Sequence, residues 1–367
     1  MSENQEPQRS LPEIRSEIDA IDRQLIEILN RRASLAQEVG RVKGQDGRPF
    51  FTPEREHQIY ERLRIENPGP LQSRQLVGIF REIISAARAA EKPLTSAYWG
   101  PAGTFSQIAA LQAFGTSSDL LACDSITEVF NAVEQNRADY GVVPVENSVA
   151  GIVQETVDAF QQSPVKICAE LYVRVEHHLV SLAADLSAIK RVYAGPQPSQ
   201  QCRHWLEANL PKAEVVDCAP TAKAAERALH DPEGAAIANR LAADIIGIPI
   251  RAENIHDHSS NRTRFLVIGF NEPARTGKDK TTLTIHLNNR PGELYRALGA
   301  LDANGVNMIL IESRPVHRGN FEYVFYTDVS GHWQDQNIRD ALDDLRKNAL
   351  QVSVLGSYPQ ADPSESN

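Results

Sequence analysis

The chain has 367 residues, 41% of them hydrophobic, and a formal net charge of -10. This length is more than one hydrophobic core usually needs, so we expect two or three folded domains. The acidic balance argues against a nucleic-acid partner, and the sequence holds no apolar run of about 18 residues for a membrane span. The four cysteines lie far apart without a C-x-x-C pair, which predicts reduced thiols in a cytoplasmic protein, with no zinc site and no disulfide framework.

Residues 10–92 are predicted to be almost wholly helical. A first helix follows a Ser10–Glu13 capping box and runs to about Lys43, and two more helices span about 53–66 and 73–91. The first helix carries an apolar stripe at three- and four-residue spacing, made of Ile14, Ile18, Ile21, Leu25, Ile28, Leu35, Val39 and Val42. Arg32 stands in one slot of this stripe, where the pattern predicts an apolar residue.

Arg32 needs an anionic partner if the stripe is buried, because an unpaired buried charge costs several kcal/mol. No acidic residue lies on the same stripe. Arg15 and Lys43 flank the stripe 28 positions apart (43 − 15), which is ~42 Å along a helix, so one small ligand cannot touch both in a single straight helix. An antiparallel copy of the helix can bring Arg15 of one chain towards Arg32 and Lys43 of the other. The spacing therefore predicts an intertwined homodimer.

Three stretches, "IRSEIDAIDRQLIEILNRRASLAQEVGRVK", "RPFFTPEREHQIYERL" and "FREIISAARAAEKP", resemble the all-helical chorismate mutase family. Members of that family form their active sites across an intertwined dimer. The resemblance implies that Arg32 and the partner subunit's Arg15 bind the substrate carboxylates, with Arg55 in support. It further implies that Lys43 contacts the ether oxygen and that Glu56 holds the ring hydroxyl.

Thr52 is another expected substrate contact. Two positions of this chain depart from the pattern of the chorismate mutase family. Some members have serine where this chain has the substrate contact Ala87, and some have glutamine where it has Glu91. A carboxylate facing the ether oxygen would repel the negative charge that develops there, so Glu91 is expected to act in its protonated form. Mutase activity is then expected to fall as the pH rises.

Residues 96–271 alternate short apolar runs with amphipathic helices, which predicts a parallel-rich α/β sheet. The runs "AYWG", "YGVVPV", "RVYA", "AAIA" and "FLVIGF" are typical of strands, and a Ser125–Glu128 capping box opens a helix over "SITEVFNAVEQ". The stretch "VKICAELYVRVEHHLVSL" is expected to be an extended crossing between two lobes.

Four motifs in this segment point to a binding site: "GPAGTFS", "VVPVENS", "GPQPSQQC" and "NRTRFLVIG". The first opens a helix whose backbone N–H groups suit an anion, although it is not the G-x-G-x-x-G dinucleotide fingerprint. The second places Glu146 and Asn147 just beyond a buried strand, where ligand sites of α/β sheets lie. A simple helix-start turn is the alternative for this second motif.

The four motifs together resemble prephenate dehydratase, a family with a two-lobed α/β fold like that of type 2 periplasmic binding proteins. The resemblance implies that Thr263 is the central catalytic residue and that Glu146, Asn147 and Gln201 shape the site. Prephenate loses carbon dioxide and its ring hydroxyl together, so the site must supply a proton or a hydrogen bond to the departing hydroxyl. Arg264 either binds substrate or braces the turn, and bracing is favoured. The further expected substrate contacts are Thr104, Ser106, Ser148, Arg264 and Phe265.

Residues 279–358 are predicted to follow the β-α-β-β-α-β order of ferredoxin-like domains. Strands are expected over "TTLTIHL", "VNMILIESRPV", "EYVFYTDVSG" and "QVSVLG", with helices after the first and the third. The motifs "NRPGEL" and "ESRPV" resemble the ACT type of regulatory domain, which binds an amino acid where two such domains pair edge to edge; a structural turn is the alternative. The resemblance implies a phenylalanine site formed by Gly292, Glu293, Leu294, Glu312, Ser313, Arg314 and Pro315.

The three resemblances together imply a bifunctional chorismate mutase–prephenate dehydratase. Its domains are an all-α intertwined mutase domain (10–92), a two-lobed α/β dehydratase domain (96–271) and a ferredoxin-like α+β ACT domain (279–358). The expected partners are chorismate and prephenate as substrates, L-phenylalanine as feedback inhibitor, and a second copy in a homodimer that can pair into a tetramer. No cofactor, nucleic acid or membrane is expected as a partner, and the polar run His256-Asp257-His258 is not expected to bind a metal.

Two alternatives to this function follow from the same segments. A dehydratase whose helical domain only dimerises is opposed by the retention of Arg15, Arg32, Lys43, Arg55 and Glu56. A non-catalytic amino-acid sensor is disfavoured by the presence of both "NRTRF" and "VENS". The absence of a dinucleotide fingerprint excludes a fused prephenate dehydrogenase.

Overall fold

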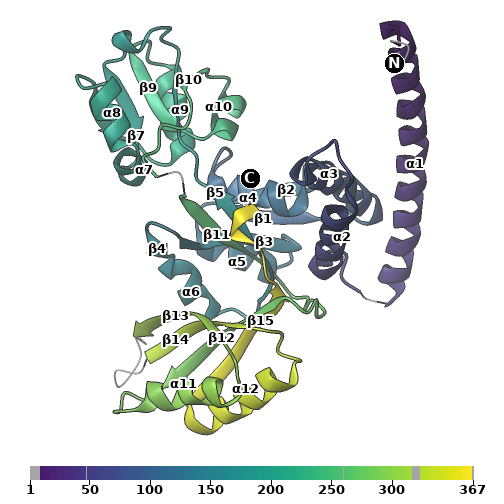
Figure 1. Cartoon of the computed structure of the whole chain (residues 1–367). Coiled ribbons are helices and arrows are strands. Elements are labelled where there is room, and N and C mark those ends of the chain that lie inside the picture. The colour runs from purple at the N-terminus through teal and green to yellow at the C-terminus, as the bar shows by residue number, and fades with distance from the viewer. Residues whose placement is uncertain (1–8, 47, 259, 316–322, 366–367) are drawn as a thin grey trace, which may run out of the picture.

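The structure is a computed structural model that describes residues 9–46, 48–258, 260–315 and 323–365. A helical N-terminal domain lies beside a central sheet, a second sheet lies on one side of the central sheet, and a C-terminal domain lies on the opposite side (Figure 1). Among the described residues, no helix combines the length and the apolar character that a membrane span requires.

The helical domain has the three predicted helices, α1 (Leu11–Asp46), α2 (Pro53–Glu66) and α3 (Ser73–Glu91). The Glu13 carboxylate accepts hydrogen bonds from the Ser10 backbone N–H at 2.8 Å and from its hydroxyl at 2.7 Å, which fixes the start of α1. Gly40 is the buried residue of α1, and a Cβ there would lie 3.0 Å from the Glu91 Cα, so α1 and α3 approach closely at this point.

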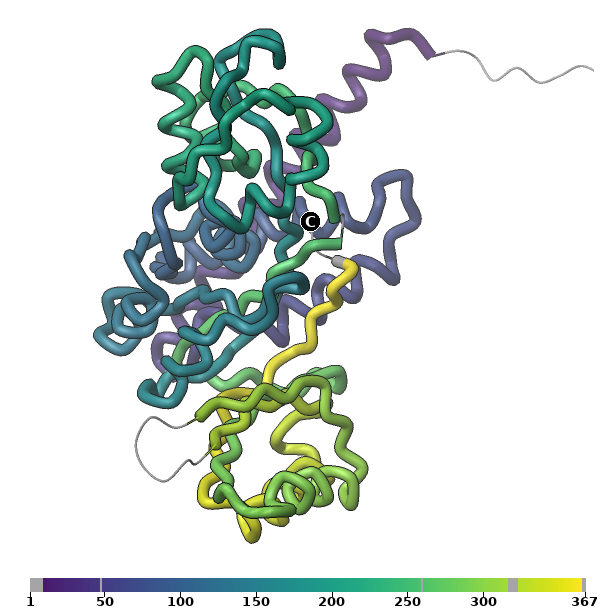
Figure 2. The backbone as a smooth tube through the Cα atoms, turned by 90° about the vertical axis from the view of Figure 1, so that its left-hand side faces the viewer, coloured from purple at the N-terminus to yellow at the C-terminus, as the bar shows by residue number. Residues whose placement is uncertain are grey.

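The apolar stripe of α1 is open to solvent in the single chain. Ile18, Ile28 and Leu35 are 50%, 63% and 54% exposed. In Figure 1 the helix lies at the outer edge of the molecule, and in Figure 2 its N-terminal end emerges clear of the other elements, while α1 contacts α3 around Gly40. A 36-residue helix with an exposed apolar stripe needs a covering surface, as the sequence pattern indicates.

The central sheet has the strand order β2-β1-β3-β11-β5, with β4 paired to β3. Its strands are β1 (Thr95–Trp99), β2 (Asp119–Cys123), β3 (Tyr140–Asn147), β4 (Gly151–Ile152), β5 (Lys166–Arg174) and β11 (Arg262–Gly269). Its helices are α4 (Phe105–Phe114), α5 (Ile126–Glu134) and α6 (Gln154–Phe160). The predicted parallel-rich sheet is wrong in part: β1 is parallel to β2 and β3, but β11 is antiparallel to both β3 and β5.

The second sheet has the order β10-β6-β9-β7-β8. Its strands are β6 (His178–Ser181), β7 (Arg191–Ala194), β8 (Glu214–Asp217), β9 (Gly234–Ala238) and β10 (Ile250–Ala252). Its helices are η1 (Leu186–Ala188), α7 (Pro196–Gln201), α8 (Arg203–Asn209), α9 (Thr221–Leu229) and α10 (Arg240–Ile246). The chain enters this sheet from β5 and returns from β10 to β11, so the predicted crossing over 165–182 is confirmed.

The two sheets also touch where the "GPAGTFS" turn meets the start of α10. The Asn239 side-chain amide donates a hydrogen bond of 2.8 Å to the Gly103 carbonyl. Gly103 has a φ of +85°, and a Cβ on it would lie 3.0 Å from the Ala242 Cα. Only glycine fits this contact without strain, because the backbone is left-handed and the neighbouring lobe is close.

The C-terminal domain has the predicted β-α-β-β-α-β order and one sheet with the strand order β13-β14-β12-β15. Its elements are β12 (Asp279–Leu287), α11 (Glu293–Ala303), β13 (Met308–Pro315), β14 (Tyr323–Ser330), α12 (Gln336–Asn348), β15 (Gln351–Pro359) and η2 (Pro363–Glu365). The predicted strand ends at Val316 and Glu322 lie outside the described residues. Both helices cover one face of the sheet, and the other face is turned towards the central sheet (Figure 1).

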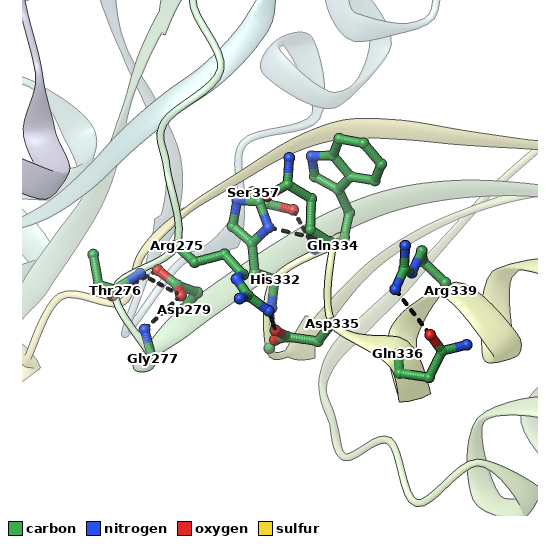
Figure 3. A network of polar contacts seen from close by, with 12 residues as sticks. Arg275, Thr276, Gly277, Asp279, His332, Gln334, Asp335, Gln336, Arg339 and Ser357 are labelled. Atoms are coloured by element: carbon green, nitrogen blue, oxygen red, sulfur yellow. Dashed lines mark hydrogen bonds and ion pairs between the residues drawn. The ribbon is translucent and has the colours of Figure 1, made fainter.

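The C-terminal domain shares a hydrophobic core with the central sheet. Buried Tyr326, Leu355 and Tyr358 belong to the same cluster as Ile167 and Leu266 of the central strands. Residues 270–278 connect the two domains and are held against the C-terminal domain (Figure 3).

Several polar contacts hold this connection. The Asp279 carboxylate accepts from the Thr276 and Gly277 N–H groups at 2.9 and 3.0 Å. Arg275 donates to Asp335 at 3.0 Å (Figure 3). The C-terminal domain is therefore fixed to the central sheet both by apolar packing and by its connection.

Candidate active sites

The first candidate site is a hollow of about 520 Å³ between α1, α3 and the start of α2. The sequence-predicted residues that line it are Arg32, Lys43, Thr52, Arg55, Glu56, Ala87 and Glu91. Arg15 does not line it, because it lies 17 residues before Arg32 (32 − 15) on the same helix, ~25 Å along the axis. Three separate helices thus bring together seven of the eight residues predicted for the mutase site.

Lys43 and Glu91 of this hollow already form an ion pair, and Arg32 has only a weak partner among the described residues. The Lys43 ammonium lies 3.1 Å from the Glu91 carboxylate and 3.3 Å from the Phe50 carbonyl. Arg32 donates to the Ile83 carbonyl at 3.3 Å, a long and weak bond that leaves most of its guanidinium available. The Lys43–Glu91 ion pair was not predicted from the sequence. From the sequence, Glu91 was expected to contact only the substrate.

Arg88 belongs to this site and was missed from the sequence. It is 6% exposed, and its Nη2 donates to Glu56 at 2.5 Å, while its Nη1 has no hydrogen-bond partner in the part of the chain that the structure describes. Its guanidinium also lies over the rings of Phe51 and Phe114, at 5.1 and 5.5 Å from their centroids. The sequence did contain a signal for Arg88. This residue follows Ile84 by four residues and occupies a position in the inner apolar stripe of α3, as Arg32 does in the stripe of α1.

Burial controls the titration of Glu56. It raises the pKa of the Glu56 carboxyl above its ordinary value, and Arg88 opposes the rise. Burial likewise raises the pKa of Glu54, one of whose carboxyl oxygens has no hydrogen-bond partner among the described residues. Glu54 lines the same hollow and is a second residue that sequence reasoning did not single out.

The second candidate site is centred on Thr263 and Asn147, which are paired across β11 and β3. The Asn147 amide donates to Thr263 Oγ1 at 2.9 Å and to Asn261 Oδ1 at 2.9 Å. Its own Oδ1 accepts from the Val149 and Ala150 N–H groups at 3.0 and 2.9 Å. Because Thr263 Oγ1 accepts from Asn147, the hydroxyl hydrogen of Thr263 remains available for another acceptor.

The predicted site residue Gln201 is held by His177, which lies at the crossing between the two sheets. His177 Nε2 is 2.9 Å from Gln201 Oε1, and the Phe105 ring lies edge-on at 5.7 Å. Burial lowers the pKa of His177 to about 4, so the ring is neutral at pH 7 and donates to the amide oxygen. No role for His177 was predicted from the sequence, because two adjacent histidines in a strand point to opposite faces and nothing local identifies their partners.

Five other residues predicted to contact the dehydratase substrate divide into two groups, those whose hydroxyls have structural hydrogen-bond partners and those that are buried. Thr104 caps α4 by accepting from the Gln107 N–H at 3.4 Å, and Ser148 accepts from the Arg262 N–H at 3.0 Å, so both hydroxyls have structural partners. Phe265 is 1% exposed in the apolar core, and Arg264 is 2% exposed and paired with other carboxylates. Because both side chains are buried, neither Phe265 nor Arg264 is placed for direct contact with substrate. The ion pairs of Arg264 instead favour its predicted bracing role. Ser106 is also buried, at 5% exposure.

Residues 14–92 match the family described as chorismate mutase type II, residues 96–273 match prephenate dehydratase, and residues 281–347 match the ACT domain. The bifunctional chorismate mutase/prephenate dehydratase of Aquifex aeolicus is 42% identical over 355 residues, which cover 96% of this chain and 98% of that protein. The chain belongs to the bifunctional chorismate mutase/prephenate dehydratase family. It is an enzyme with one mutase domain and one dehydratase domain.

Two solved structures are similar to the dehydratase and ACT domains of this bifunctional enzyme. The prephenate dehydratase of Arthrobacter aurescens, in complex with L-Phe, is 35% identical with a TM-score of 0.70, covering 74% of this chain and 91% of that chain. GqqA, described as a novel type of quorum quenching acylase, is 31% identical with a TM-score of 0.68, covering 73% and 98%. Because one fold carries two named activities, the family matches and not the fold decide the function.

The ACT domain of the bifunctional enzyme brings its two predicted motifs to one end of its sheet. Pro315 on β13 is paired with Tyr323 on β14, which is paired with Leu287 at the end of β12, just before the "NRPGEL" turn. Gly292 opens α11 with a φ of +84°, a conformation that favours glycine. The motif residues at this end are Gly292, Glu293, Leu294, Glu312, Ser313 and Pro315, with Arg314 turned to Asp158 of α6 at 2.8 Å.

Proposed function

We propose that this enzyme rearranges chorismate to prephenate in the helical domain (10–92) and converts prephenate to phenylpyruvate in the dehydratase domain (96–271). L-Phenylalanine acts as feedback inhibitor through the ACT domain (279–358). The observation that carries the proposal is the convergence of Arg32, Lys43 and Arg55 from α1 and α2 on one hollow. A dianionic substrate is the ligand that such a set of cations recognises.

The mutase step is a pericyclic rearrangement, so the protein needs to hold one compact conformer and to stabilise charge on the breaking ether bond. Arg32, Arg55 and the partner subunit's Arg15 bind the two carboxylates. Lys43 donates to the ether oxygen, and Glu56, oriented by Arg88, holds the ring hydroxyl. The exposed stripe of α1 pairs with the same stripe of a second copy in an intertwined homodimer, which can pair further into a tetramer.

In the dehydratase step, the ring carboxylate leaves as carbon dioxide, the electron pair of its broken bond enters the ring, and the ring hydroxyl departs as hydroxide, which becomes water by taking a proton from solvent. Thr263 donates a hydrogen bond to the departing oxygen and keeps its proton, since Asn147 already donates to Thr263 Oγ1. Glu146 and Gln201 orient the substrate, with Gln201 fixed by His177. The two lobes act as a clamp of the type 2 periplasmic-binding-protein kind, which the order β2-β1-β3-β11-β5 supports.

L-Phenylalanine binds between ACT domains of two chains, at the end of the sheet that carries Gly292–Leu294 and Glu312–Pro315. Support comes from the Arthrobacter aurescens prephenate dehydratase, which was solved with L-Phe. The position of β13 at the edge of the sheet also leaves it free to pair with a second copy. The four cysteines are buried and unpaired, in keeping with a cytoplasmic enzyme.

One experiment tests these assignments together. The full-length protein is incubated with chorismate, and prephenate and phenylpyruvate are quantified with and without L-phenylalanine. We expect both products, and less phenylpyruvate with the amino acid. Conversion of added prephenate but not of chorismate would identify the helical domain as a dimerising element only, and no conversion of either would favour a sensor.

A further inference from the structure

Four buried charges join the dehydratase domain to the ACT domain. Glu170 on β5 and Arg264 on β11 come from the central sheet, and Lys280 on β12 and Asp328 on β14 come from the ACT domain. Their side chains are between 0% and 2% exposed. We call these four residues the interdomain ionic cluster.

The cluster is closed by short polar contacts and carries two charges of each sign. Arg264 Nε donates to Glu170 at 2.7 Å, and its Nη1 donates to Asp328 at 2.6 Å. Lys280 donates to the same Glu170 oxygen at 2.8 Å. Since each domain contributes one cation and one anion, neither domain leaves an unpaired charge in the interface.

Neutral hydroxyls of the ACT domain complete the contacts of Arg264 and Asp328. Arg264 Nη2 donates to the Tyr358 hydroxyl at 3.0 Å. Thr282 Oγ1 donates to the second Asp328 oxygen at 2.7 Å and lies 2.5 Å from the Tyr358 hydroxyl. The Asp328 carboxylate is thus held in one orientation and fixes the guanidinium in turn.

Arg264 is also directly connected to the dehydratase site. It follows Thr263 in β11, and its register partner on β3 is Glu146, next to Asn147. Arg264 Nη1 lies 3.8 Å from the Glu146 carboxylate but 2.6 Å from Asp328. Arg264 Nη1 therefore lies between Asp328 of the ACT domain and Glu146 of the proposed dehydratase site. It is hydrogen-bonded to Asp328.

We propose that Asp328 is a positioning residue for the dehydratase reaction. Its carboxylate keeps the Arg264–Glu146 ion pair long, at 3.8 Å, so that Glu146, 36% exposed, can face the substrate. When Asp328 is removed or displaced, Arg264 Nη1 closes the remaining distance and pairs with Glu146, which then no longer orients prephenate. This inference rests on the proposed role of Glu146.

The test compares two charge-balanced double variants of the full-length enzyme. K280M/D328N removes one cation and one anion from the cluster, including the hold on Arg264 Nη1. E170Q/K280M also removes one of each but keeps Asp328, and serves as the matched control. We expect K280M/D328N to lower kcat for prephenate by about ten- to hundred-fold with little change in KM, and E170Q/K280M to stay within about two-fold of the wild type.

A second comparison separates positioning from a merely structural role. In an E146Q background, followed in single turnovers with excess enzyme, the loss caused by K280M/D328N is expected to disappear, because its target is gone. An equal loss in both double variants, or an unchanged loss in the E146Q background, overturns the proposal. Mutase activity in the same preparations reports on folding.

If K280M/D328N does not fold, Thr282→Val releases Asp328 without changing any charge. It is expected to give a smaller loss of kcat that is again absent with E146Q, and an additive loss overturns the proposal. Failure of the wild type to convert prephenate would instead refute the proposed function.

Discussion

Replacing Arg32 by leucine tests the central assignment of the helical domain. The substitution completes the apolar stripe of α1, whose neighbours Ile28 and Leu35 are 63% and 54% exposed in the single chain. Arg32 makes one long hydrogen bond, to the Ile83 carbonyl at 3.3 Å. Its loss is expected to change the free energy of unfolding by no more than about 1 kcal/mol.

The same substitution is expected to abolish mutase turnover. A guanidinium that binds a carboxylate through two charged hydrogen bonds contributes about 1.5 to 3 kcal/mol per bond, so kcat/KM for chorismate should fall by about 10²- to 10⁴-fold. A buried leucine contributes about 2 kcal/mol in an apolar interface, so the dimer should be at least as stable as in the wild type.

Mutase activity is followed as the loss of chorismate, and subunit association by sedimentation equilibrium. Arg31→Leu is the matched control, because Arg31 is the adjacent exposed arginine of α1 and does not line the hollow. Two results refute the reasoning: R32L chains that dissociate, which makes the arginine structural, or R32L chains that keep full mutase activity.

Three further predictions concern the groups around the two sites. Arg88→Met keeps the packing against Phe51 but leaves Glu56 without its cation, so we expect a higher KM for chorismate and unchanged dehydratase kinetics, measured side by side on one preparation. Glu91→Gln removes the carboxylate that pairs with Lys43 at 3.1 Å but keeps an amide that can donate to the ether oxygen, so we expect mutase turnover at pH 7 to be kept or to rise; a large loss would refute a hydrogen-bond donor role for this side chain. Burial lowers the pKa of His177 from 6.5 to about 4, so protons bind more readily to the unfolded chain, and stability falls as the pH decreases from about 6.5 to 4, by up to about 3 kcal/mol. Heat inactivation of the dehydratase across this range should be less pH-dependent in H177Q, and an equal dependence in both proteins contradicts the assignment.

The helices and the ACT topology were predictable because their signals are local. The Ser10–Glu13 box, Pro53 and the apolar periodicities mark the limits of α1, α2 and α3 within a few residues. The direction of a strand within its sheet has no such local signal in the sequence. β11 is antiparallel because the chain returns to the central sheet from the second sheet, and no residue within "RTRFLVIG" encodes that return.

The site residues divide in the same way. Arg32 was identified because a cation interrupts a long apolar pattern. Phe265 was assigned to the substrate with Thr263 by its place in the motif, but a register shift between Arg264 and Phe265 interrupts the pairing of β11 with β3, and Phe265 packs in the core. His177 and Gln201 meet only through the fold, since 24 residues separate them in the sequence.

Three arginines of this chain lie where its folded units meet or are expected to meet. Arg32 lies on the α1 face expected to meet a second chain, Arg88 lies between Glu56 of the helical domain and Phe114 of α4, and Arg264 lies between the central sheet and the ACT domain. A buried guanidinium is costly without an anion, and an apolar core within one domain supplies none. Arg88 has its anion, Glu56, within the helical domain, whereas Arg264 takes one of its anions, Asp328, from the ACT domain, and the proposed anion of Arg32 is the substrate. Arg32 and Arg264 therefore connect assembly of the enzyme to its two proposed reactions.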